Sequence, residues 1–149
     1  VSILFFLQKE LSSKDLFLYI LIQIVAAILG TFFANYIFGL NVIEISSNMR
    51  SGTNIYISEI FAAIGLLLVI LLSRTDGKNI VAFNVGIYIT AAIIFTSSAS
   101  FANPAVTIAR VFTESFAGIN PSTVIFFISC QVIGMFAAYL LYNQFFKSK

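Results

Sequence analysis

Residues 100–110 have the sequence "SFANPAVTIAR", a polar, proline-containing stretch between two long apolar runs. Asn103 is a favourable N-cap residue and Pro104 suits the first position of a helix, so we predict a helix over residues 103–117. At about 1.5 Å per residue this helix would be roughly 20 Å long, which is about half a membrane. The irregular backbone before it, residues 98–102, can lie at that depth only where protein or water satisfies its polar groups. An N-capped helix at the membrane surface is the alternative explanation.

The composition is that of a membrane protein. The 149 residues are 60% hydrophobic and 9% charged, with a mean hydropathy of +1.02. A hydrocarbon core of about 30 Å needs about 20 apolar residues, and four runs reach that length: 16–38, 53–73, 80–99 and 122–146. Glu59 is the one charged residue within these runs. A soluble protein with fully buried helices is the alternative, but four uncharged helices would leave nothing to face water.

The charged residues indicate an orientation rather than a ligand. The net charge of +2 comes from basic residues at the ends of the runs, so nucleic-acid binding is not indicated. If the four spans alternate in direction, Arg50 and Arg110 lie on one side of the membrane and the remaining cations on the other: Lys9, Lys14, Arg74, Lys78, Lys147 and Lys149. Cations favour the cytoplasmic side, so the C-terminus is predicted to be cytoplasmic.

The chain offers no constellation for catalysis or metal binding. It has no His, and its single Cys130 lies inside an apolar run, where it is expected to pack as a small core residue. No nucleophile, base and orienting group converge, and no cluster of metal ligands exists. We therefore expect no enzymatic activity, no metal site and no cofactor.

The segment beginning at Val1 is similar to the segment beginning at Val106. Each opens with Val, Ser or Thr, and Ile, continues through a short amphipathic piece and a polar turn, and then enters a long apolar run. Gln23 in the first run matches Gln131 in the second, and small residues follow both: Ala26, Ala27 and Gly30, then Gly134, Ala137 and Ala138. Such small residues let helices pack closely in lipid. Because Val106 follows Asn-Pro-Ala, we expect Val1 to follow another copy of that tripeptide, which makes residues 1–11 part of an earlier half-helix.

Three stretches together carry a resemblance to a known family. They are the loop quoted above, the Glu-bearing run "YISEIFAAIGLLLVILLSRTDGK" at residues 56–78, and the run "NVGIYITAAIIFTSSA" at residues 84–99. With the repeat, they resemble the major intrinsic proteins, the aquaporins and glycerol facilitators, over essentially the whole chain. Val106 stands where most members have Arg, which is similar to a bacterial subgroup of the family.

The resemblance implies an all-α membrane fold, an aquaporin-like bundle of two inverted repeats with re-entrant half-helices. On this plan residues 1–149 are a single membrane domain that lacks spans one and two and cannot enclose a pore alone. Its parts would be the first half-helix (1–11), span three (16–38), an outer loop (39–52), span four (53–73), span five (80–99), the second half-helix (103–117) and span six (122–146).

The resemblance also assigns roles to individual residues. The side-chain amide of Asn103 would donate a hydrogen bond to the permeating solute, Pro104 and Ala105 would complete the motif, and the carbonyl groups of residues 100–102 would accept hydrogen bonds. Glu59 would be buried against this loop and would hold it through backbone N–H groups. A proton relay is the rival role for a carboxylate inside the membrane.

The resemblance implies a selectivity filter built from one residue each on spans two and five and two residues in the loop, of which the span-two residue is absent from residues 1–149. The position in the run falls at Ala91, with Thr90 as the alternative, and the loop positions fall at Ser100 and Val106. Water-selective members have His in the run and Arg in the loop, and this chain has neither. The resemblance therefore implies a wider filter.

Arg110 adds a complication to this filter. It lies four residues after Val106, on the same face of a helix, and helical side chains lean toward the N-terminus. Its guanidinium can thus return a positive charge to the filter. Pairing with Glu114, or contact with lipid headgroups, is the alternative, and the sequence leaves both open.

These features predict a passive channel for water and small neutral solutes, namely glycerol-like polyols and also metalloid hydroxides. A secondary transporter with broken helices and a non-conducting membrane scaffold are the alternatives. The expected partners are the lipid bilayer, the solute and, as a family expectation, further copies in a homotetramer. The expected location is the bacterial inner membrane.

Overall fold

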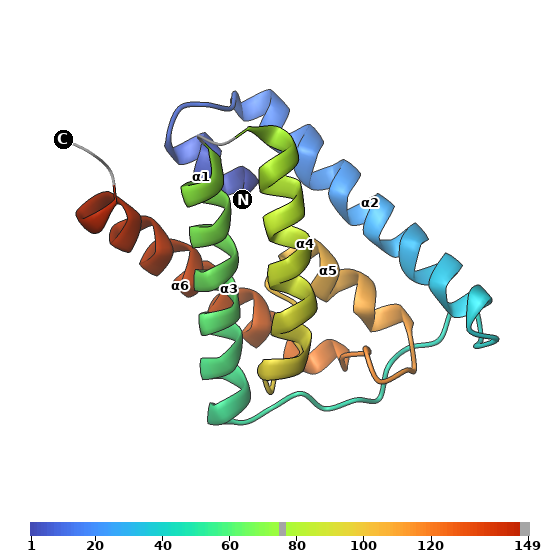
Figure 1. Ribbon diagram of the computed structural model, residues 1–149. Helices are drawn as coiled ribbons and strands as arrows, with labels where there is room; N and C mark the ends of the chain where they lie inside the picture. Colours follow the sequence, from blue (N-terminus) through green and yellow to red (C-terminus); the bar gives the residue numbers. More distant parts are fainter. Residues whose placement is uncertain (75–76, 147–149) are drawn as a thin grey trace. The chain divides into compact units, whose positions relative to one another are not determined.

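The computed structural model describes residues 1–74 and 77–146. Lys147 and Lys149, which entered the prediction of membrane orientation, lie outside the described residues. Within the described ranges the regular structure is helical and contains no strand (Figure 1). Among the described residues, four helices are long and apolar enough to cross a membrane: α2 (Ser13–Ile37), α3 (Thr53–Ser73), α4 (Lys78–Phe95) and α6 (Pro121–Phe145). The expectation of an all-α membrane protein is confirmed.

The chain forms two compact units, and helix α6 is divided between them. The first unit contains residues 1–51 and 103–128, and the second contains residues 52–102 and those from 129 onward. Three short elements belong to the first unit: α1 (Ser2–Leu7), α5 (Pro104–Ala109) and the 3-10 turn η2 (Arg110–Phe112). Each unit is described separately below.

In the first unit, α1, α5 and η2 pack against α2 (Figure 1). The hydroxyl of Ser12 caps the start of α2 by accepting a hydrogen bond from the backbone N–H of Asp15 at 3.1 Å. Asn35 is the one buried residue of this 25-residue helix. The other side chains of α2 are mostly apolar and partly or fully exposed, which suits a helix surrounded by lipid.

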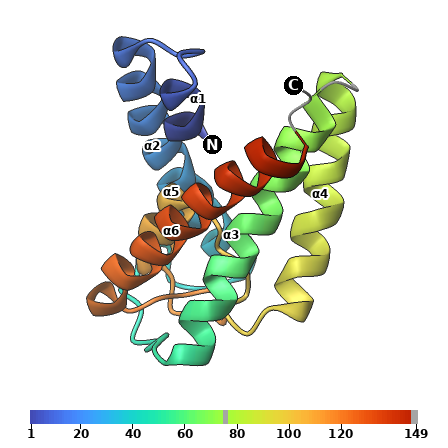
Figure 2. The ribbon, with the colours of Figure 1, turned by 90° about the vertical axis from the view of Figure 1, so that its left-hand side faces the viewer.

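In the second unit, α3 and α4 lie side by side (Figure 2). Two small residues set how closely the helices approach. The ring of Tyr88 lies over Gly65, and the Tyr88 hydroxyl donates a hydrogen bond to the carbonyl of Ala62 at 2.9 Å. A Cβ at Gly134 in α6 would lie 2.7 Å from the Cβ of Ala63. These contacts match the principle that small residues allow close helix packing in membranes.

Two predicted elements are shorter in the structure than the sequence suggested. Helix α4 ends at Phe95 rather than at residue 99, because Thr96 is extended and the chain then turns at Ala99, whose φ is +60°. Helix α1 ends at Leu7 rather than at residue 11. Lys9 has a φ of +62°, and the N–H of Glu10 donates to the carbonyl of Phe5 at 2.9 Å, which closes the helix with a Schellman turn.

The half-helix after Asn103 also differs from the prediction of 103–117. It is α-helical only to Ala109, continues as η2 to Phe112, and is irregular from residue 113 to residue 120. At about 1.5 Å per residue α5 is roughly 9 Å long, and η2 adds roughly 6 Å at about 2 Å per residue, so the helical part is shorter than the roughly 20 Å predicted. The reason for this early end lies in the partners of its last carbonyl groups, described below.

Candidate functional site

Asn103 and Pro104 begin α5 as the sequence predicts. Asn103 is extended, with φ −153° and ψ 122°, and its side-chain Oδ1 accepts a hydrogen bond from the N–H of Ala105 at 2.9 Å. Pro104 occupies the first helical position, where no N–H is needed. Because Oδ1 is used for the cap, the Nδ2 amide of Asn103 is the group that remains as a donor.

The loop before this helix, residues 96–102, has a strained backbone. Ala99, Ser100 and Ala102 have φ values of +60°, +45° and +49°, a left-handed conformation that is unfavourable for residues other than Gly. Each such residue costs about 1 kcal/mol or more. The surrounding contacts must therefore hold this loop in place.

Glu59 supplies the strongest of these contacts. Its side chain is fully buried in α3, where Oε1 accepts a hydrogen bond from the N–H of Ala102 at 2.6 Å and Oε2 accepts one from the N–H of Phe101 at 3.3 Å. Gln131 in α6 donates its Nε2 amide to Oε1 at 2.7 Å. This geometry is what the loop-supporting role of Glu59 requires. The sequence identified Gln131 only as the counterpart of Gln23 in the repeat. Its hydrogen bond to Glu59 was not predicted.

Serine side chains complete the support of loop 96–102. The N–H of Ser98 donates to Ser58 Oγ at 3.3 Å, and the N–H of Ser100 donates to Ser98 Oγ at 3.2 Å. Ser98 and Ser100 are both buried. In the part of the chain that the structure describes, the hydroxyl oxygen of Ser100 is buried without a hydrogen-bond partner. A buried hydroxyl of this kind costs free energy unless a bound molecule satisfies it.

The remaining filter candidates lie in different units. Ala91 and Thr90 are exposed on α4, where both line a hollow along the helix, and the Thr90 hydroxyl donates back to the carbonyl of Gly86 at 2.8 Å. Like Ser100, they belong to the second unit, whereas Val106 and Arg110 belong to the first.

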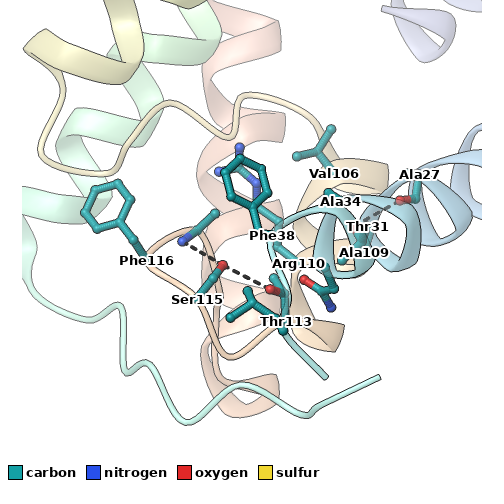
Figure 3. Close-up of a pocket in the computed structure, with 14 residues that line it drawn as sticks. Ala27, Thr31, Ala34, Phe38, Val106, Ala109, Arg110, Thr113, Ser115 and Phe116 are labelled. Carbon is teal, nitrogen blue, oxygen red and sulfur yellow. Dashed lines mark hydrogen bonds between the residues drawn. The ribbon is translucent and has the colours of Figure 1, made fainter. Parts of the chain in front are cut away.

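Val106 and Arg110 line one cavity of about 700 Å³ in the first unit (Figure 3). One wall is formed by α2, which contributes mainly small and apolar side chains: Ala27, Gly30, Thr31, Ala34 and Phe38. The other wall follows α5, η2 and the next residues, and it includes the polar side chains of Thr113 and Ser115. Arg110 is thus a positive charge beside Val106 in a largely apolar cavity, as the helical spacing of the two residues suggested.

Glu114, the possible partner of Arg110, is engaged by another loop. The backbone N–H and the hydroxyl of Ser47 both donate to its carboxylate. The hydroxyl of Ser47, followed by its backbone N–H, lowers the pKa of Glu114 from its usual value of 4.5. The carboxylate is therefore ionised at neutral pH and anchors Ser47.

Comparison with known proteins identifies a relative along almost the whole chain. The aquaglyceroporin AqpS of Rhizobium meliloti (strain 1021) is 40% identical over 141 residues, which is 95% of this chain. The chain belongs to the major intrinsic protein family. No protein-family model and no solved structure matches it.

The chain spans 60% of the length of that relative. Aquaglyceroporins are channels rather than enzymes, so the similarity supports the prediction that the chain is not an enzyme. Together with the four apolar helices, it also supports an integral membrane protein.

Proposed function

We propose that the whole protein forms a passive transmembrane channel for water and small neutral solutes of the glycerol type. The observation that carries this proposal is the backbone around Asn103. Its Oδ1 caps α5 and leaves Nδ2 as a donor, while Glu59 engages the N–H groups of Phe101 and Ala102. What this stretch offers a solute is therefore one amide donor followed by carbonyl acceptors, which is the general arrangement of aquaporin-type pores.

The size and polarity of the filter candidates favour solutes larger than water. Ala91, Ser100 and Val106 are small or short side chains, and the buried hydroxyl of Ser100 adds a hydrogen-bonding group beside the carbonyl row. A polyol carries several hydroxyls that can each donate and accept. Uncharged metalloid hydroxides present the same groups at a similar size. The name of the relative, an aquaglyceroporin, points to the same class of solute.

We assign Arg110 to the filter as its cationic group, because it lines the same cavity as Val106. A guanidinium in an apolar cavity repels cations and offers several donors to a neutral hydroxyl-bearing solute. In the whole protein, Arg110→Ala is expected to change the ratio of glycerol to water permeability and to weaken cation exclusion. The matched control is Arg74→Ala at the end of α3. If Arg110→Ala leaves both properties unchanged, Arg110 has no role in the filter.

The channel itself is tested by osmotic swelling of vesicles that contain the whole protein. We expect water and glycerol permeabilities about tenfold or more above those of protein-free vesicles, because a pore removes the cost of dehydrating a polar solute in hydrocarbon. Asn103→Ser is the informative variant, since Ser retains the N-cap but lacks the amide donor. It should fold as the wild type and conduct less. Equal permeability of the wild-type and protein-free vesicles would contradict the proposal.

Assembly and orientation belong to the same proposal. The whole protein is expected to form homotetramers in the bacterial inner membrane with its C-terminus in the cytoplasm. Chemical crosslinking in membranes tests the tetramer. Protease access to a C-terminal tag in sealed, right-side-out vesicles tests the orientation.

A further inference from the structure

Residues 45–51, which we call the strap, bind the irregular segment 113–120 that follows the half-helix. The strap lies between α2 and α3 in the sequence, and four of its polar residues form hydrogen bonds to residues 111–120: Ser46, Ser47, Asn48 and Arg50. At least seven hydrogen bonds join these two parts of the first unit. Neither the family similarity nor the proposed pore chemistry assigns a role to this strap.

The end of the half-helix is capped at three successive carbonyl groups. The carbonyl of Arg110 accepts from the N–H of Ile119 at 3.1 Å, and that of Val111 accepts from the N–H of Ser46 at 2.8 Å. The carbonyl of Phe112 accepts from Asn35 Nδ2 at 2.9 Å. The last carbonyls of a helix have no partner within the helix, and here three different segments supply one. The capping explains why the helix ends at Phe112, and it fixes the backbone that carries Arg110.

Arg50 holds the segment beyond this end. Its Nε donates to the carbonyl of Gly118 at 2.8 Å, its Nη2 donates to the carbonyl of Phe116 at 2.5 Å, and the guanidinium carbon lies 5.9 Å from the centre of the Phe116 ring. Asn48 Nδ2 donates to the carbonyl of Ser115 at 2.6 Å. The guanidinium of an arginine holds its N–H donors in a rigid planar fork, a geometry that the ammonium group of a lysine does not have.

Close packing leaves little freedom at the same place. A Cβ at Gly118 would lie 2.2 Å from the carbonyl oxygen of Thr113 and 2.3 Å from Ser46 Oγ. On the other side of the segment, the carboxylate of Glu114 accepts both the N–H and the hydroxyl of Ser47. Donors of the strap thus bind both carbonyl groups of segment 113–120 and the carboxylate of Glu114, and in the reverse direction the N–H of Asn120 donates to the carbonyl of Asn48 at 2.8 Å.

We propose that the strap is a positioning device for the filter, in which Arg50 and Glu114 set solute selectivity through Arg110. The carbonyls of Arg110 and Val111 are bound by Ile119 and by the strap residue Ser46, so a displaced strap moves the backbone on which the Arg110 guanidinium is mounted. This inference rests on the proposed channel function. It adds that residues without contact to the solute determine which solutes pass.

The first test measures the strap without requiring conduction. Hydrogen exchange of the whole protein is followed by mass spectrometry in lipid nanodiscs for the wild type, Arg50→Gln and Glu114→Gln. The peptides that contain the amides of Ser46, Ile119 and Asn120 should exchange about tenfold faster in Arg50→Gln, because a charge-assisted hydrogen bond is lost. The matched control is Glu44→Gln, since Glu44 lies in the same loop and binds Asn41. Unchanged exchange in both Arg50→Gln and Glu114→Gln would overturn the proposal.

The second test measures selectivity as the ratio of glycerol to water permeability in vesicles. Arg50→Gln should shift this ratio in the same direction as Arg110→Ala. In the Arg110→Ala background, Arg50→Gln should cause no further shift, because the strap acts through Arg110. A shift of the same size in both backgrounds, or no shift in either, would overturn the positioning role even if exchange is faster. A wild type that conducts neither water nor glycerol would instead contradict the channel function and with it this selectivity role, while the exchange data would still report whether the strap holds the segment.

Discussion

The half-helix α5 lies between two irregular segments that are held by opposite chemistry. Loop 96–102, before the helix, is held by acceptors, chiefly the buried carboxylate of Glu59, which bind backbone N–H groups. Segment 113–120, after the helix, is held mainly by donors, chiefly the guanidinium of Arg50, which bind backbone carbonyl groups. The two segments belong to different compact units, and in each a charged side chain binds two backbone groups: Glu59 in the first and Arg50 in the second.

The polarity of the backbone explains this difference. The segment before the helix presents the N–H groups of Phe101 and Ala102, which need an acceptor such as a carboxylate. The segment after the helix presents the carbonyl groups of Phe116 and Gly118, which need a donor such as a guanidinium. The burial of each charged side chain determines how much free energy its contacts contribute. Glu59 is completely buried, whereas Arg50 is only partly buried. We therefore expect loss of the Glu59 contacts to lower the free energy of unfolding more than loss of the contacts that hold segment 113–120.

The largest effect is expected for Glu59→Gln. The new amide retains the shape of the side chain but places a donor where Glu59 now faces the donors of Ala102 and Gln131. We expect a loss of about 3 kcal/mol or more in the free energy of unfolding, as for other buried charged groups whose partners are left unsatisfied. Thermal unfolding of the whole protein in detergent micelles measures it. With Glu44→Gln as the exposed control, equal stability of the two variants would show that Glu59 does not support the loop.

A smaller loss is expected for Gly118→Ala on the donor side. The added methyl group meets the carbonyl oxygen of Thr113 and Ser46 Oγ at distances that real Cβ atoms do not tolerate, so the strap must shift. We expect about 2 kcal/mol of destabilisation in the same unfolding assay. Gly86→Ala in α4 is the matched control, because no atom lies within 4 Å of its added Cβ, and Ala favours the helix. Two glycine variants of equal stability would contradict the close packing described at Gly118.

Asn35→Ala tests the part of the exit cap that α2 provides. The Nδ2 of Asn35 donates to the carbonyls of Val42 and Phe112, at 3.1 Å and 2.9 Å. Its removal leaves both carbonyls without this donor, at a cost of about 1–2 kcal/mol. Unfolding in micelles should rank this variant below Gly118→Ala in severity. Asn41→Ala, in an exposed loop, serves as its control and should be close to neutral.

The smallest effect concerns the pH dependence of the Ser47–Glu114 contact. Hydrogen bonds from Ser47 lower the pKa of Glu114, so their stabilisation is fully present above the unfolded pKa of 4.5 and is lost as the pH falls through the lower folded value. The amide chemical shift of Ser47, followed by NMR in micelles, should change only below pH 4.5. In Glu114→Gln the same signal should stay flat. A wild-type transition above pH 4.5 would contradict this sign.

The features that the sequence predicted are those fixed by local chemistry. The N-cap at Asn103, Pro104 at the first helical position and the four long apolar helices depend on residue type and run length alone. The end of the half-helix does not depend on residue type and run length alone. No Gly or Pro occurs from Ala105 to Ala117, so residue types predict a longer helix, whereas distant capping groups end it at Phe112.

The missed residues share a reason as well. Arg50 was read as a charge that reports membrane orientation, but its partners are backbone carbonyls 66 and 68 residues away, for which no side-chain pattern exists. Gln131 meets Glu59 across 72 residues. The alternative pairing of Arg110 with Glu114 assumed a continuous helix. The helix ends at Phe112, so the helical spacing of four residues does not extend to Glu114, which accepts hydrogen bonds from Ser47.

The central claim is passive conduction, and it is tested most directly by glycerol equilibration into vesicles that contain the whole protein. The rate is measured first with proton and sodium gradients imposed in either direction and then with both collapsed. A channel built on Asn103 and its carbonyl row predicts the same rate under every condition, because the solute is neutral and no coupling ion is bound. A rate that falls to the protein-free value when the gradients are collapsed would contradict the claim and would make the protein a coupled transporter.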